Sequence, residues 1–230
     1  MLACAMVLWI ANFRYSDQRA LTDFGLVSIV AWPFWAALGL VSLGFGLTLI
    51  HSTSNAWLRA SFPVSLIFML HATPAIVYGT LRYSWAWKHL GIIDFIQRHD
   101  SIDRFAGFLP AYHNWPGFFI SAAVIGELTG ATPIEIASAV RFTPVVLTLL
   151  TSAMVALILR HFTGDRRAIA VAVWFYVCGN WIGQDYFAPQ AVTYFMFLAI
   201  IALCLGPMRK PVPAYAAAGR GVFRWALHML

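Results

Sequence analysis

The sequence predicts an all-α, polytopic integral membrane protein. Its 230 residues are 61% hydrophobic and only 10% charged, and the mean hydropathy is +0.75. A soluble domain carries about 45–50% apolar and about 25% charged residues. The core of a chain this small cannot take up so much apolar surface, so part of that surface must face lipid. The composition therefore excludes a water-soluble globular protein, and equally a disordered or fibrous one.

Long apolar stretches predict about five or six transmembrane helices. Crossing a bilayer takes about 20 mostly apolar residues, and a helix satisfies all of its backbone hydrogen bonds within the segment. We expect one transmembrane domain over 1–230, with N-terminal crossings in 1–81, interfacial helices in 82–141, three crossings in 142–207 and a tail in 208–230. The candidate crossings are 24–50, 60–81, 142–159, 168–183 and 191–207, and 1–13 is interpreted as the remainder of another.

Short basic segments predict the orientation in a cell membrane. Residues 160–167 join two apolar stretches and carry three arginines, and the C-terminal tail is also basic. The positive-inside rule places both in the cytoplasm. Alternation of the crossings then makes 82–141 and 181–190 extracytoplasmic.

The long segment between crossings is predicted to form amphipathic helices at the membrane surface. Residues 87–100 place Leu90, Ile93 and Ile96 on one side of a helix and Trp87 and Arg98 on the other. Tryptophan side chains are typical of the headgroup level. Two further amphipathic pieces, 116–132 and 133–141, lead into the next crossing.

Three carboxylates in this segment are the first candidates for chemistry. Asp94, Asp100 and Asp103 lie among basic residues, including Lys88 and His89. Carboxylates at this height suit a general base or metal ligands, and nearby cations suit a phosphate. The sequence leaves open whether a divalent metal is required. Two structural alternatives are a surface Asp94–Arg98 pair and a helix cap at Asp100.

The short connection 180–190 is the second candidate, because it holds more hydrogen-bonding side chains than a turn needs. Its polar residues are Asn180, Gln184, Asp185 and Gln190, with aromatic side chains between them. Amides beside aromatic rings suit a sugar or a polar headgroup. The structural alternative is a helix cap in an aromatic belt.

Two smaller features complete the candidates. His113, Asn114 and Trp115 precede Pro116, which also suits a simple helix start with an aromatic anchor. His71 interrupts an apolar crossing, and polar groups inside a membrane usually face a partner.

The motifs WKHLGIIDFI (87–96), NWPGFF (114–119) and NWIGQDYFAPQ (180–190), in this order, resemble the GT-C superfamily of polytopic glycosyltransferases over residues 82–207. The resemblance implies a polyprenyl-phosphate sugar as donor and an acidic base in the first outer loop that deprotonates the acceptor hydroxyl. Members place that acid just before the interfacial helix, where this chain has Trp85-Ala86-Trp87. Asp94 is therefore the expected base, with Asp100 and Asp103 as alternatives.

The same resemblance distributes the remaining roles. Arg82, Lys88 and His89 are expected to balance charge on the leaving phosphate. Asn180, Gln184, Asp185 and Gln190 are expected to position the sugar, and His113, Asn114 and Trp115 are further candidates for substrate binding.

The expected function is transfer of a sugar in cell-envelope glycan assembly at the extracytoplasmic face. Expected partners are membrane lipid, the lipid-linked sugar and a larger membrane protein, but not nucleic acid, because the basic residues are scattered singly. The chain lacks the C-terminal crossings and soluble domain of the family, so it is expected to be a fragment, a truncated paralogue or an inactive subunit. Two rival functions are a transporter or flippase, and a non-catalytic subunit of an envelope-assembly complex.

Overall fold

The computed structural model describes residues 1–51, 55–108, 110–180 and 185–208, and this part of the chain is helical without a β-strand. Most of the predicted tail therefore lies outside the described residues. The helices are α1 (Leu2–Asn12), α2 (Trp32–Ile50), α3 (Ala56–Ile67), α4 (Thr73–Tyr78), α5 (Ser84–His99), α6 (Pro110–Asn114), α7 (Gly117–Thr129), α8 (Pro133–Val140), α9 (Thr143–Leu159), α10 (Arg166–Gly179) and α11 (Pro189–Leu205).

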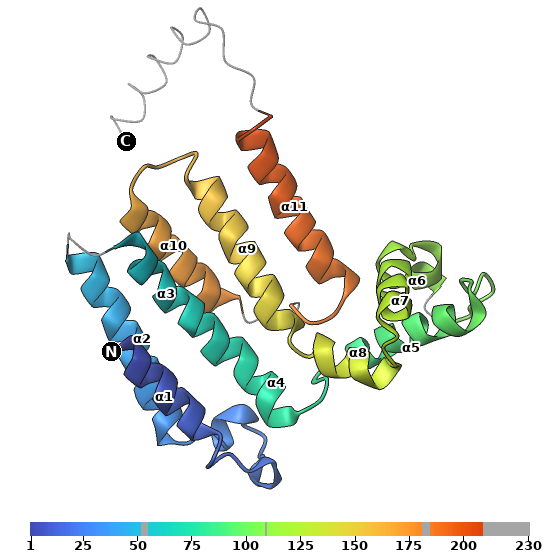
Figure 1. The fold of residues 1–230 in the computed structure, drawn as a ribbon, viewed down its shortest axis with the longest axis horizontal. Coiled ribbons are helices and arrows are strands. Elements are labelled where there is room, and N and C mark those ends of the chain that lie inside the picture. The colour runs from blue at the N-terminus through green and yellow to red at the C-terminus, as the bar shows by residue number, and fades with distance from the viewer. Residues whose placement is uncertain (52–54, 109, 181–184, 209–230) are drawn as a thin grey trace, which may run out of the picture.

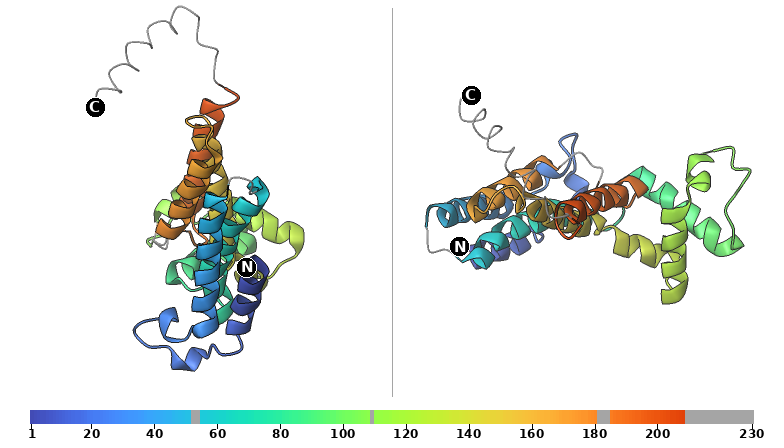
Figure 2. Two further views of the ribbon diagram at one scale, coloured as in Figure 1. Left: turned by 90° about the vertical axis from the view of Figure 1, so that its left-hand side faces the viewer. Right: turned by 90° about the horizontal axis from the view of Figure 1, so that it is seen from above.

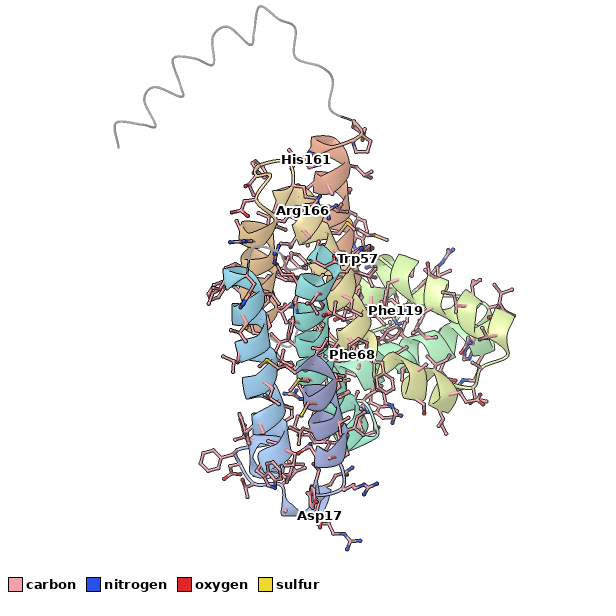
Figure 3. All side chains as sticks on the ribbon, turned by 60° about the vertical axis from the view of Figure 1, so that its left-hand side comes forward. Asp17, Trp57, Phe68, Phe119, His161 and Arg166 are labelled. Atoms are coloured by element: carbon pink, nitrogen blue, oxygen red, sulfur yellow. The ribbon has the colours of Figure 1, made fainter. Side chains whose placement is uncertain are left out.

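The long helices run up and down side by side in one bundle (Figure 1). The C-terminal ends of α2, α9 and α11 lie at one end of the bundle, together with the start of α10. The segment 13–31 lies at the other end, as Asp17 and Arg166 mark in Figure 3, and helices α5, α7 and α8 project to one side of the bundle. The predicted orientation of the chain in a membrane stays a prediction.

In the part of the chain that the structure describes, two helices are long and apolar enough to cross a membrane, namely α2 and the continuous α3–α4 run, Ala56–Tyr78. A third crossing results only if α7 and α8, bent by 112°, form one span. Helices α1, α9 and α11 are apolar but shorter. The all-helical membrane class is thus supported, whereas the expected five or six crossings are not confirmed by helix length.

The core of the bundle is formed by α1, α2, α3, α9 and α10. Gly44 on α2 lets the ring of Phe62 on α3 approach so closely that an added Cβ would lie 2.4 Å from Phe62 Cε1. Phe45 stacks on Trp174 of α10 with ring centroids 4.4 Å apart. Large apolar side chains also cover the outside, such as Trp57 with 83% exposure. An apolar exterior over an apolar core is what lipid-facing helices require.

A second, smaller core joins α5, α7 and α8 and stands to one side of the long helices (Figure 2). The predicted amphipathic helix is confirmed as α5, with Leu90, Ile93 and Ile96 buried and Arg98 exposed. Helix α8 begins with a capping box, in which Thr132 and Glu135 satisfy each other's backbone N–H groups.

The α3–α4 run contains one π-helical turn, Phe68–Ala72. Pro74 explains it, because proline has no N–H for the helical ladder and its ring clashes with the carbonyl of Leu70 four residues earlier. The helix accommodates the missing hydrogen bond by forming one wider, π-helical turn. π-turns of this kind are frequent at functional sites, and His71 lies in this one.

Candidate functional site

A buried histidine–aspartate pair is the main polar feature of the bundle. His71 Nδ1 and Asp185 Oδ2 are 2.8 Å apart, although the residues are 114 positions apart in sequence. Their side chains are only 10% and 13% exposed. His71 lies seven residues before the end of α4, or about 10 Å along the helix. The expectation that His71 faces a partner is confirmed, and the partner is Asp185.

This geometry leaves two atoms of the pair for other contacts. The bond uses Asp185 Oδ2 and does not engage Oδ1. His71 Nε2 is buried without a hydrogen-bond partner among the described residues. A buried polar atom without a hydrogen-bond partner costs about 1–3 kcal/mol of stability. His71 is therefore a costly residue for a position that only packs against apolar neighbours.

The pair lines a cavity of about 290 Å³ at the end of the bundle where α4, α5, α8, α9 and α10 meet. Two arginines, Arg82 and Arg141, line it together with Tyr83 and Asn180. The remaining wall is mainly apolar and includes Leu70, Pro74, Val140, Pro144 and Val177. The cavity thus combines a carboxylate, an imidazole and two cations with an apolar wall.

Both arginines contact groups close to helix ends. Arg141 Nη1 donates to the carbonyl of Gly79 at 2.7 Å. Gly79 ends α4 with φ +65°, a left-handed conformation that favours glycine. The Arg82 guanidinium carbon lies 5.0 Å from the ring centroid of Tyr83. Neither arrangement uses all the donors of a guanidinium, so both arginines can bind an anion.

Tyr83 adds a neutral hydrogen-bond donor beside these charges. Burial raises the pKa of its hydroxyl; the Arg82 charge opposes this rise, and the Asp185 charge adds to it. Tyr83 also packs on Tyr186, with ring centroids 5.0 Å apart. The phenol therefore keeps its proton at neutral pH.

A second cavity, of about 590 Å³, lies between α9, α10 and α11 and shares Asn180 and Asp185 with the first. Its wall carries the side-chain hydroxyls of Thr148, Thr151, Tyr176 and Tyr194, and Gln190 also lines it. Asn180 Nδ2 lies 3.5 Å from Thr148 Oγ1. Asp185 thus stands between two cavities.

The three predicted carboxylates lie elsewhere. Asp94 forms an ion pair with Arg98 one turn along α5. Asp100 ends α5 in a left-handed conformation with φ 50°. Asp103 Oδ1 accepts from the backbone N–H of Phe105 at 2.9 Å. None of the three lines the cavity of the His71–Asp185 pair, and their contacts match local structural roles.

The other predicted residues divide between structural and exposed positions. His89 is fully buried and its Nδ1 lies 2.9 Å from the carbonyl of Phe187. Burial lowers the pKa of His89 and this hydrogen bond opposes the shift, so the neutral imidazole ties α5 to the segment before α11. His113 accepts from the backbone N–H of Asp103 at 3.2 Å. Asn114, Trp115 and Lys88 are exposed.

The cavity of the His71–Asp185 pair therefore collects only part of the predicted set, namely Arg82, Asn180 and Asp185. Lys88, Asp103 and His113 line a separate pocket against α5. Gln184 lies outside the described residues. Within the described chain, no three His, Cys, Asp or Glu side chains come together as a metal site, so the divalent metal stays untested.

The described residues form an all-helical fold with two or three candidate membrane-spanning helices and a largely buried acid–imidazole pair beside two arginines. Comparison of the chain with protein-family models, with curated proteins and with solved structures gives no match. The function therefore has to be argued from the geometry of the cavity.

Proposed function

We propose that the chain is a glycosyltransferase-like membrane protein of cell-envelope glycan assembly, which transfers a sugar from a polyprenyl-phosphate donor at the extracytoplasmic face. One observation supports this above all others. Asp185, His71, Arg82 and Arg141 line one cavity with an apolar wall. A lipid-linked donor needs this combination: a base for the acceptor, cations for the phosphate, and an apolar surface for the first part of its chain.

In the proposed reaction Asp185 is the general base and His71 a positioning residue. Asp185 takes the proton of the acceptor hydroxyl, and the resulting oxygen forms a bond to the anomeric carbon of the sugar. The bond from that carbon to the phosphate oxygen breaks, and polyprenyl phosphate leaves with the electron pair. His71 fixes the carboxylate through Oδ2. General bases of this type contribute about 10²–10⁴-fold to the rate.

The two arginines stabilise the leaving group. Negative charge develops on the phosphate as the bond breaks, and guanidinium groups bind phosphate oxygens in a bidentate geometry. Arg141 is oriented beforehand by its hydrogen bond to Gly79, which lowers the reorganisation that the charge transfer requires; Arg82 lies against the ring of Tyr83.

The base assigned here is not the one expected from the sequence. Asp94 is neutralised by Arg98 on α5 and lies outside the cavity. Asp185 is held at the cavity wall by a long-range contact to His71. The proposal therefore moves the base from Asp94 to Asp185 and keeps Asn180 as a sugar-binding residue.

The proposal includes a multi-pass arrangement in the cell membrane. Helices α1, α9 and α10 pack against α2 or the α3–α4 run, and α11 packs against α9. This arrangement favours their inclusion in the bilayer and would give the five or six crossings. Residues 82–141 and 185–190 are then extracytoplasmic, and 160–167 and the C-terminus cytoplasmic, as the basic residues of 160–167 favour.

The test is donor turnover by the purified chain in nanodiscs, with radiolabelled polyprenyl-phosphate sugars and a membrane-derived acceptor fraction. Release of polyprenyl phosphate is measured for wild type, Asp185→Asn and the matched control Asp94→Asn. We expect Asp185→Asn to lose about 10²–10⁴-fold and Asp94→Asn to stay near wild type. Loss of activity in Asp94→Asn alone would return the base to the interfacial helix. Inactive wild type that co-purifies with a larger membrane protein would favour the non-catalytic subunit.

A second candidate function is transport or flipping of a polar solute. The hydroxyl-lined cavity between α9, α10 and α11 favours it, because that cavity continues from Asp185 along the helices. A transporter predicts that Thr148→Val with Thr151→Val abolishes flux across a proteoliposome membrane. The transferase predicts that the same variant keeps most of its turnover.

A further inference from the structure

A basic groove lies between α3, α9 and α10, apart from the His71–Asp185 cavity. Its volume is about 290 Å³, and it is lined by three arginines, Arg59, Arg160 and Arg166. The rest of the lining is almost wholly apolar and mostly small, with Ala60, Pro63, Val64, Ile67, Leu149, Ala153, Ala156, Ile169, Ala170 and Val173. Ser152 and Ala56 complete it.

The groove is polar at one end and apolar along its length. Its arginines lie near the start of α3, just past the end of α9 and at the start of α10. From Arg59 to Ile67 on α3 the lining extends about 12 Å, at about 1.5 Å per residue. A charged mouth above an apolar channel is complementary to a lipid, with the headgroup at the mouth and the first part of the acyl chain in the channel.

The charge at the mouth is of one sign. Guanidinium groups are charged at all physiological pH values, and among the described residues no carboxylate lines the groove. The nearest acid in sequence, Asp165, uses its carboxylate to cap α10 by accepting from the backbone N–H of Arg167 at 2.8 Å. Three cations around one mouth favour an anionic ligand, and arginine matches phosphate best.

The mouth lies at the height expected for headgroups. Trp57, in the first turn of α3, is 83% exposed, and Figure 3 shows it and Arg166 toward the same end of the bundle. Exposed tryptophan side chains gather at the boundary between membrane and water. Basic pockets between transmembrane helices bind anionic lipid headgroups.

We propose that this groove binds an anionic phospholipid of the surrounding bilayer. Arg59, Arg160 and Arg166 hold the phosphate, and one acyl chain lies along the apolar faces of α3, α9 and α10. The site is independent of the His71–Asp185 cavity, so it stands whether or not the chain transfers sugars.

The test measures phospholipid binding to the full chain by native mass spectrometry and by thermal stability in detergent. The probes are phosphatidylglycerol, phosphatidylcholine, polyprenyl phosphate and inorganic phosphate. The variant Arg160→Gln/Arg166→Gln removes two exposed arginines and should fold. Arg14→Gln/Arg19→Gln removes the same charge at the opposite end and is the matched control. A third variant, Ala153→Phe, fills the apolar part of the groove.

We expect wild type to prefer phosphatidylglycerol over phosphatidylcholine and to gain stability from it by mass action. Arg160→Gln/Arg166→Gln should lose about 30-fold in affinity, at about 1 kcal/mol for each arginine, and Ala153→Phe should also weaken binding. The control should bind like wild type. Equal affinity for both phospholipids, an unaffected arginine variant or an equal effect of inorganic phosphate would each overturn the proposal. Binding of polyprenyl phosphate that is stronger than that of phosphatidylglycerol and is lost in Arg160→Gln/Arg166→Gln would also overturn it, whereas binding that this variant leaves unchanged belongs to the His71–Asp185 cavity.

Discussion

The contact between Gly44 and Phe62 yields a prediction that tests the packing of α2 on α3. In Gly44→Ala the new Cβ would lie 2.4 Å from Phe62 Cε1 and 2.8 Å from Cζ, whereas an ordinary contact is about 3.5–4.0 Å. Phe62 is only 4% exposed, so its ring cannot move aside without displacing the core. Overpacking of this kind costs about 1–3 kcal/mol. Alanine recovers about 1 kcal/mol through its helix propensity, which leaves a net loss of about 1 kcal/mol.

The same helix offers a matched control. An alanine Cβ at Gly46 would meet nothing within 4 Å, so Gly46→Ala should gain about 0.5–1 kcal/mol. The assay is unfolding of the purified protein in mild detergent by titration with a denaturing detergent. The two variants should shift the midpoint in opposite directions. Equal shifts in one direction would refute the close approach of α2 and α3.

Three further predictions concern single residues. His89 is buried with a lowered pKa, so it takes up a proton on unfolding. The free energy of unfolding should reach its full value above pH 6.5 and fall below that pH by up to about 1.4 kcal/mol per pH unit. His89→Phe should flatten this part of the pH profile. An unchanged profile in the variant would contradict the burial of His89. Trp9→Phe removes the 2.9 Å hydrogen bond to Thr73 and should cost about 0.5–1.5 kcal/mol in the same unfolding assay; no loss would argue against this contact. Asp100 has φ 50°, so Asp100→Gly should be about 1 kcal/mol more stable than Asp100→Ala; the reverse order would contradict the left-handed end of α5.

The helices were predictable from composition and local pattern. Charge-free stretches identify the long helices, and the predicted limits are close to those of α9 and α11. The predicted crossing 24–50 begins too early, because α2 starts only at Trp32, with Pro33 in its first turn. The buried side of α5 also follows from helical periodicity alone. These properties depend on neighbouring residues, which the sequence displays directly. The number of crossings cannot be determined in this way, because the shorter helices fall below the length that identifies a membrane-spanning helix.

The site was only partly predictable. His71 and Asp185 each attract notice as polar residues in or beside apolar stretches, but nothing local joins two residues 114 positions apart. Arg141 gave no signal of its own, because it reaches the cavity only after α8 and α9 have packed beside α4. Asp94 was expected as the base because of its place in an interfacial helix, and its ion pair with Arg98 is the local alternative that the spacing also allows. Sequence spacing identifies helix faces, whereas tertiary packing decides which faces meet.

A double-mutant cycle on donor turnover tests the central claim most directly. His71→Gln, Asp185→Asn and the double variant are compared with wild type for release of polyprenyl phosphate. If His71 acts only by positioning Asp185, the double variant should be no slower than Asp185→Asn alone, because residues that act as a unit are not additive. Independent, multiplicative losses, or full activity of Asp185→Asn, would contradict the account.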